Sequence, residues 1–116
     1  MFSNIGCDSC HVRTMNTGPN PVAALNNKDV NLFSDLLLHN IGTGDRIVQG
    51  KATGDDFRTA PLWGLSQRDH FMHDGQSKTI QDAILRHSVE AQNALNGFVG
   101  LLKPEHDALL AFLGSL

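Results

Sequence analysis

The clearest pattern of hydrophobic and polar positions covers residues 77–89, where apolar side chains recur at helical spacing. Positions i, i+3, i+4 and i+7 are held by Ile80, Ala83, Ile84 and His87. This spacing predicts an amphipathic helix with His87 on its apolar face. Ser77 or Thr79 can cap the helix, and Asp82 stands three residues after Thr79 as in a capping box.

Two further segments predict helices. Residues 104–115 have Pro104 in the first turn and Gly114 at the end, and their apolar stripe consists of Leu109, Leu110, Phe112 and Leu113. Residues 3–15 predict a short helix near the N-terminus, with Ile5 and Val12 seven residues apart.

The middle of the chain has no comparable helical pattern. Residues 16–30 are rich in turn-forming residues and predict irregular structure. The apolar run in residues 31–42 fits a strand or a helix equally well. Residues 43–56 predict an exposed loop, and Pro61 argues against a central strand in residues 57–66.

Composition limits the classes of function. The chain has 116 residues, of which 41% are hydrophobic and 18% charged, as expected for one globular domain with a modest core. Its net charge of −3, without a basic cluster, argues against nucleic-acid binding. No run of 18 apolar residues is present, so the sequence predicts no membrane span.

The strongest chemical signal is Cys7-Asp8-Ser9-Cys10-His11, a C-x-x-C-H motif that contains both cysteines of the chain. The motif is typical of c-type haem attachment: two thiols form thioethers to the porphyrin, and the histidine binds the iron. A thioredoxin-like redox pair would need a βαβ setting. A zinc site would need further histidines, and no second motif follows at zinc spacing.

The motif bears on where the protein works. Haem c is attached outside the cytoplasm, yet Met1 stands only six residues before Cys7, and no signal peptide precedes the motif. We therefore expect a periplasmic protein whose signal was removed or lies upstream. The motif's position favours a piece excised from a longer protein.

Several segments occur in an order that resembles a known family. After the C-x-x-C-H motif come FSDLLLHNIG (33–42), FRTAPLWGL (57–65), HDG (73–75) and the Ile80–His87 helix. Together they resemble the C-terminal haem domain of the di-haem cytochrome c peroxidase and MauG-like superfamily. The branch they resemble most is the di-haem oxidoreductase, or thiol oxidoreductase, a peroxidase-like group.

The resemblance implies a fold and an organisation. We expect an all-α, cytochrome c-like helical domain around one covalently attached haem, with long irregular loops. Residues 1–116 would form a single c-type cytochrome domain, the C-terminal part of a longer di-haem protein. Full-length members carry two haems, so a second haem domain or another redox protein is the expected partner. Arg68 and His70 stand where other members have a calcium-binding Thr-x-Pro, which argues against that calcium site.

The resemblance also bears on the iron ligands. His11 is the expected proximal ligand, and His87 occupies the position of the distal ligand that follows HDG. The apolar-face argument indicates the same residue. Met72 is the alternative sixth ligand, and an open or water-bound iron is the third possibility.

Four other residues are candidates for haem contact. His39 and His73 can hydrogen-bond a propionate or a backbone carbonyl, or make only a local turn hydrogen bond. Arg58 can pair with a propionate or with a solvent-exposed acid. Trp63 is expected in the core, with haem contact as the alternative.

These residues favour electron transfer over catalysis. Two imidazole ligands leave no open position for peroxide, so we expect an electron-transfer domain that feeds or drains a second haem domain, with no catalytic residues of its own. The alternatives are a self-contained haem peroxidase or thiol oxidoreductase and, last, a zinc-binding module.

Overall fold

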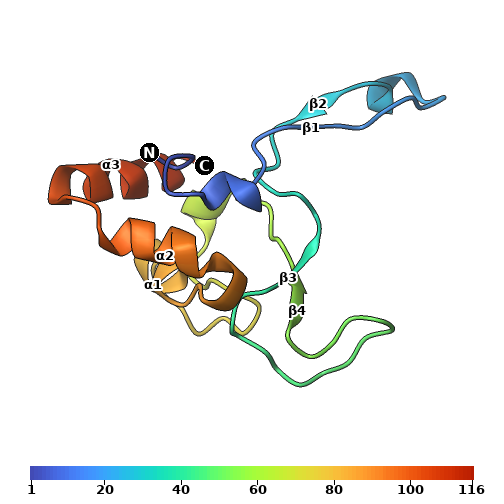
Figure 1. Cartoon of the computed structure of the whole chain (residues 1–116). Coiled ribbons are helices and arrows are strands. Elements are labelled where there is room, and N and C mark those ends of the chain that lie inside the picture. Colours follow the sequence, from blue (N-terminus) through green and yellow to red (C-terminus); the bar gives the residue numbers. More distant parts are fainter.

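The computed structural model describes residues 1–116, and it combines helices with short strands (Figure 1). The three helices are α1 (Ile80–Leu85), α2 (Gln92–Val99) and α3 (Lys103–Leu113). Strands β1 (Met15–Asn16) and β2 (Asp29–Val30) form one antiparallel sheet, and β3 (Leu38–Asn40) and β4 (Asp56–Arg58) form another.

The expectation of an all-α domain is therefore wrong. Residues 15–79 contain no α-helix, because glycine, proline and asparagine interrupt the chain too often for a helical repeat. Phe33 and Leu36 have left-handed backbone conformations on either side of Ser34 and Asp35, so the apolar run of 31–42 cannot continue as a helix. The run instead enters β3, where Leu38 pairs with Arg58 and His39 pairs with Phe57.

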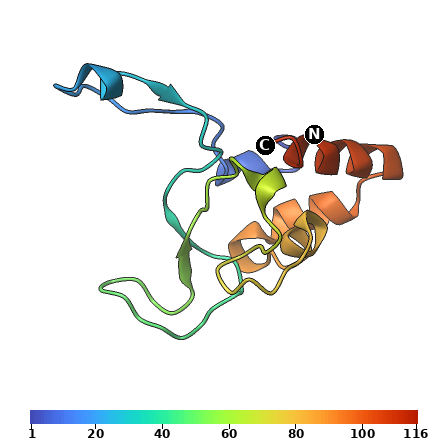
Figure 2. The same ribbon diagram turned by 180° about the vertical axis from the view of Figure 1, so that it is seen from behind.

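The β1–β2 sheet lies away from the helices (Figure 2), whereas β3 lies beside the short 3₁₀ turn Val89–Ala91 that leads into α2. The β1–β2 pair forms an arm that projects from the body, and the β3–β4 pair is closed by a long loop. That loop is largely exposed over residues 43–56, as predicted. Pro61 follows the end of β4 and lies outside both sheets.

The expectation of an N-terminal helix over residues 3–15 is also wrong. Only a short 3₁₀ helix, Cys7–Ser9, forms there. Gly6 precedes it with φ of 88°, a left-handed conformation that ends any regular helix before the motif. The segment from Val12 onward is extended and enters β1.

The C-terminal half agrees better with the prediction. Helix α1 begins after Thr79, whose hydroxyl accepts a hydrogen bond from the Asp82 N–H at 3.0 Å. It ends at Leu85, earlier than expected, so His87 lies just beyond it. Helix α3 runs from Lys103 to Leu113 with proline in its first turn, as predicted. Helix α2 was not predicted.

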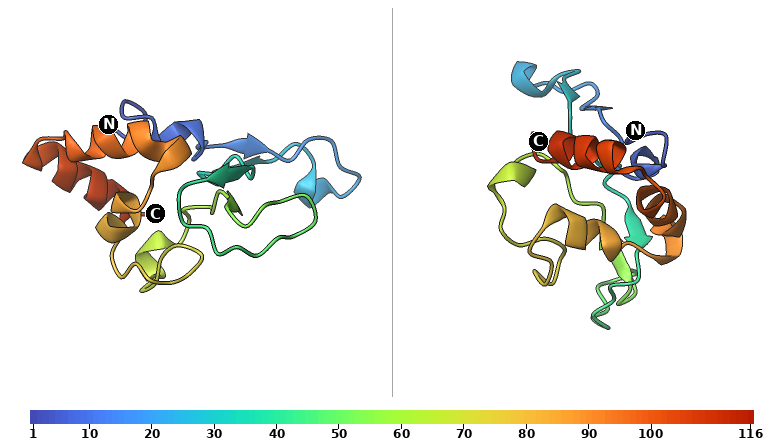
Figure 3. Two further views of the ribbon diagram at one scale, coloured as in Figure 1. Left: turned by 60° about the horizontal axis from the view of Figure 1, so that its bottom comes forward. Right: turned by 90° about the vertical axis from the view of Figure 1, so that its left-hand side faces the viewer.

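The core lies among the three helices and the segment that precedes α1 (Figure 3). Its buried members are Leu65, Phe71, Ala83, Phe98, Leu109 and Leu113. The N-terminal turn closes one side, where the Phe2 ring lies 5.6 Å from that of Phe112 and 6.1 Å from that of Phe33. This packing brings residues 1–11 next to the helices. None of the helices is long and apolar enough to span a bilayer.

Candidate functional site

The C-x-x-C-H motif forms a compact turn at the edge of the helical body. Cys7 and Cys10 are both half-buried and unpaired. The His11 N–H donates to the Cys7 carbonyl at 2.9 Å, and the Asp35 N–H donates to the Cys10 carbonyl at 2.8 Å. These bonds fix the turn internally and join it to the chain that leads into β3.

The two thiols do not resemble a reactive redox pair. Burial, with Asp8 as the next cause, raises the pKa of Cys7 to about 11. Burial also raises the pKa of Cys10, and the Asp35 and Glu90 carboxylates add to the effect. Both thiols are therefore protonated at neutral pH, whereas catalytic dithiols need a lowered pKa on the attacking cysteine.

The structure brings His11 and His87 together, although they lie far apart in the sequence. Their ring centres are 6.5 Å apart. The Nδ1 atom of His11 lies 2.9 Å from the Phe33 carbonyl oxygen, and that of His87 lies 2.7 Å from the Ala83 carbonyl oxygen. A carbonyl oxygen only accepts, so both rings carry their proton on Nδ1 and keep a lone pair on Nε2.

This arrangement fits a metal ion between the two rings. Burial lowers the pKa of both imidazoles, which keeps them neutral at pH 7. Two imidazoles bound through Nε2 to opposite sides of one metal ion have ring centres about 6 Å apart, since each metal–nitrogen bond is about 2 Å long. A backbone carbonyl on the other ring nitrogen is the usual support for a metal-binding histidine. His11, His87, Cys7 and Cys10 are thus the residues that could hold a haem.

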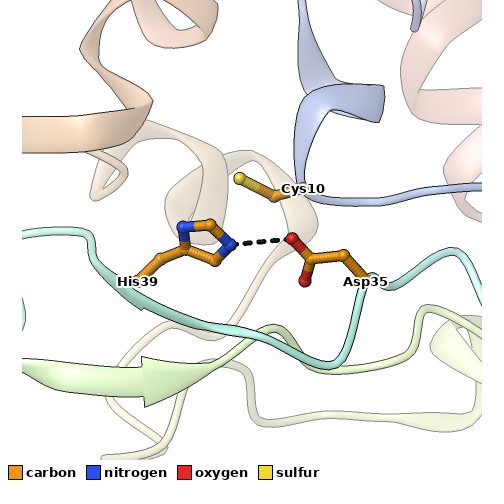
Figure 4. Close-up of side chains that lie close together, drawn as sticks. All are labelled: Cys10, Asp35 and His39. Atoms are coloured by element: carbon orange, nitrogen blue, oxygen red, sulfur yellow. Dashed lines mark hydrogen bonds and ion pairs between the residues drawn. The ribbon is translucent and has the colours of Figure 1, made fainter.

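A second cluster lies beside Cys10, where Asp35 and His39 place their side chains near the thiol (Figure 4). The ligand atoms of these three residues all lie within 4.8 Å of one another. However, His39 Nε2 is 2.8 Å from Asp35 Oδ2, and His39 Nδ1 is 2.9 Å from Glu90 Oε2. Hydrogen bonds to Glu90 and then Asp35 raise the pKa of His39. In the protonated form that they favour, neither ring nitrogen has a lone pair for a metal.

His39 and His73 have different surroundings. Both ring nitrogens of His39 are hydrogen-bonded to carboxylates, those of Asp35 and Glu90, rather than to a backbone carbonyl. The His73 ring stacks on Phe57, with ring centres 3.7 Å apart.

Three further candidates lie elsewhere. Met72, the alternative ligand, packs against the core of the helices. Arg58 is exposed in β4, beside a cavity that Asp45 and Asp56 also line, and makes no ion pair. Trp63 was expected in the core, but 50% of its surface is exposed, so that expectation is wrong.

An ion pair that the sequence does not reveal holds the end of α1. Arg86 directly precedes His87 and pairs through two nitrogens with the carboxylate of Asp74, the middle residue of HDG. Arg86 Nη1 also donates to Ser77 Oγ at 3.2 Å. The sequence does show a cation, Arg86, at the end of the predicted helix and an acid, Asp74, in the turn before it. Their spacing alone does not show that they pair.

Comparison with known proteins gives one result. No curated protein and no solved structure matches the chain. A family model does match, over residues 1–116, and it describes a "Di-haem oxidoreductase, putative peroxidase". The resemblance inferred from the ordered motifs is confirmed by this match, which covers the whole chain. The chain therefore belongs to the di-haem oxidoreductase family.

Proposed function

We propose that this chain is a c-type haem domain that transfers electrons, in which His11 and His87 would hold the iron. The observation that carries the proposal is the pair of neutral imidazoles with ring centres 6.5 Å apart. Each has its Nδ1 bonded to a backbone carbonyl and its Nε2 unbonded. Membership of a di-haem family supports haem as the group between them.

The side chains have separate roles in this proposal. Cys7 and Cys10 would provide the sulfur atoms of two thioethers that attach the haem to the motif turn. The Phe33 and Ala83 carbonyls hold the imidazoles of His11 and His87 in the tautomer that can bind metal. When bound, the haem supplies an iron that accepts or releases one electron.

The ligand set favours electron transfer over peroxide chemistry. With both His11 and His87 bound, the iron would have no open position for peroxide, so this ligand set would suit electron transfer without a bound substrate. Two imidazoles also give a lower reduction potential than an imidazole and a thioether. Met72, the candidate thioether ligand, is partly buried and packs against the hydrophobic core.

The rest of the di-haem assembly is part of the same proposal. The chain contains one C-x-x-C-H motif, whereas its family is described as di-haem. We infer that residues 1–116 act as one cytochrome domain and exchange electrons with a second haem domain in the periplasm. The family description favours a peroxidase as the second candidate, with this domain supplying electrons to the peroxidatic site.

Covalent attachment is the first part of the proposal to test. The protein is produced with a periplasmic signal in cells that attach haem c, and is compared with a Cys7→Ala/Cys10→Ala variant. We expect the wild type to keep its haem through acid–acetone extraction and to gain the mass of one haem, because two thioethers hold it. The double variant should lose all haem in the extraction.

Two results would contradict this part of the proposal. One is a wild-type protein that binds one haem per chain but loses it in the acid–acetone extraction. The other is a chain with one zinc ion and no haem absorption, which would favour the zinc-binding module.

A further inference from the structure

The chain that follows His87 is bonded to the β3 segment. The Ser88 N–H and the Ser88 hydroxyl both donate to the Ile41 carbonyl, each at 3.1 Å. Two residues later, Glu90 Oε1 accepts a hydrogen bond from the Asn40 N–H at 2.8 Å. The position of His87 therefore depends on the β3 segment as well as on helix α1, which ends just before it.

His39 extends this connection to the other side of the site. Its imidazole lies between Glu90 Oε2, at 2.9 Å, and Asp35 Oδ2, at 2.8 Å. The Asp35 N–H in turn donates to the Cys10 carbonyl at 2.8 Å. We call this connection the Asp35–His39–Glu90 bridge. It runs from the motif turn beside His11 to the chain just after His87.

The bridge is well placed to resist movement. Its bonds join an imidazolium to two carboxylates, and such charge-assisted hydrogen bonds are stronger than neutral ones. The side chains of Asp35 and His39 are only 11% and 18% exposed, so water screens this pair weakly, while Glu90 is 51% exposed. Helix α1 has only six residues and ends before His87, so it restrains the histidine on one side only.

We propose that the Asp35–His39–Glu90 bridge is a positioning element that keeps His87 at a fixed separation from His11 and so slows its exchange for an external ligand. The inference rests on the proposed haem ligation. The bridge touches neither ring nitrogen that would bind iron, and it acts through the backbone on either side of the site. The Asp74–Arg86 pair holds the opposite side of His87 and is unchanged by variants of the bridge.

Cyanide binding to the ferric holoprotein tests the proposal. At saturating cyanide the observed rate is limited by the departure of His87. We expect His39→Gln to raise this limiting rate about tenfold, the factor for loss of one charged hydrogen bond. Glu90→Ala should raise it by more, because it removes the bonds to both His39 and the Asn40 N–H. Glu90→Gln should raise it less, because the amide oxygen can still accept from the Asn40 N–H.

The matched control is Asp107→Asn, which removes another carboxylate–cation pair. Asp107 pairs with Lys103 at 2.6 Å on the exposed face of α3, and neither residue contacts the bridge. We expect this variant to bind cyanide at the wild-type rate.

A second readout does not depend on cyanide. In Glu90→Ala, amide hydrogen exchange should become faster at Asn40 and Ser88, whose N–H groups bond across this connection, and stay unchanged within α3. A low-spin wild type whose bridge variants bind cyanide at the wild-type rate contradicts the inference alone. A high-spin wild type contradicts the proposed ligation, and the inference with it.

Discussion

At the scale of single residues, Gly97 determines how closely the N-terminal segment approaches α2. An ideal Cβ built at Gly97 would lie 2.8 Å from Ile5 Cβ and 3.2 Å from Ile5 Cγ2. Real Cβ atoms do not approach so closely, so a side chain at this position would push Ile5 away. Because Ile5 lies two residues before Cys7, this contact also locates the C-x-x-C-H motif against the helices.

Gly97→Ala should destabilise the protein, although alanine is the better helix former. The helix preference favours alanine by about 1 kcal/mol, while overpacking against Ile5 costs about 1–3 kcal/mol. We expect a net loss of about 1 kcal/mol in the free energy of unfolding, measured by denaturant titration with circular dichroism. In an Ile5→Gly background, which removes Ile5 Cβ as well as Cγ2, the sign should reverse. Stabilisation by Gly97→Ala in the wild-type background would contradict the contact.

Some residue contacts could be expected from the sequence and others could not. Helical periodicity made His87 a candidate, because the apolar face of a helix is a local property, although α1 ends before His87. The bonds of His39 were not predictable, because Glu90 lies 51 residues away and reaches His39 only through the tertiary fold. Asp74 was noted within a motif, but its pairing with Arg86 depends on the turn between them.

At the scale of elements, α1 is the helix on which the proposed site depends. It is capped by Thr79 at its start and held by the Asp74–Arg86 pair at its end. Its start and the whole of α3 were predictable, because capping residues, proline and glycine act locally. The ladder between β3 and β4 was not, because it joins segments separated by a long loop and the run in 31–42 fits either kind of element.

The Asp74–Arg86 pair predicts a specific dependence of stability on pH. The Arg86 guanidinium holds the pKa of the Asp74 carboxyl below its ordinary value of 3.8. A lowered pKa in the folded state stabilises the fold above pH 3.8, and this contribution is lost as the pH falls below that value. Asp74→Asn should therefore be less stable than the wild type at pH 7, and the difference should shrink between pH 5 and about pH 3.

Thermal unfolding across this pH range, followed by circular dichroism, measures that difference. Arg86→Gln is the matched variant, because it removes the other half of the pair and should give the same trend. Comparing each variant with the wild type at the same pH removes the effects of acid on stability that both proteins share. A difference that stays constant from pH 7 to about pH 3 would contradict the ion pair as its cause.

At the scale of the whole molecule, the helices and the N-terminal turn form a body from which an arm and a loop extend (Figure 1). The radius of gyration is 15.3 Å, against about 13 Å for a compact domain of this length. Family resemblance led to the family and to the His11–His87 pair, but it overstated the helical content. The two small sheets depend on pairings that neither periodicity nor motif order reveals.

The visible spectrum of the holoprotein, ferric and then reduced with dithionite, tests iron ligation by His11 and His87. Ligation by His11 and His87 predicts low-spin spectra in both states, with sharp ferrous bands and without the weak red-edge band of a ferric thioether bond. His87→Gly should turn the ferric spectrum high-spin. A high-spin spectrum in the wild type would mean an open iron position, contradict His87 as the resting ligand, and favour a peroxidase.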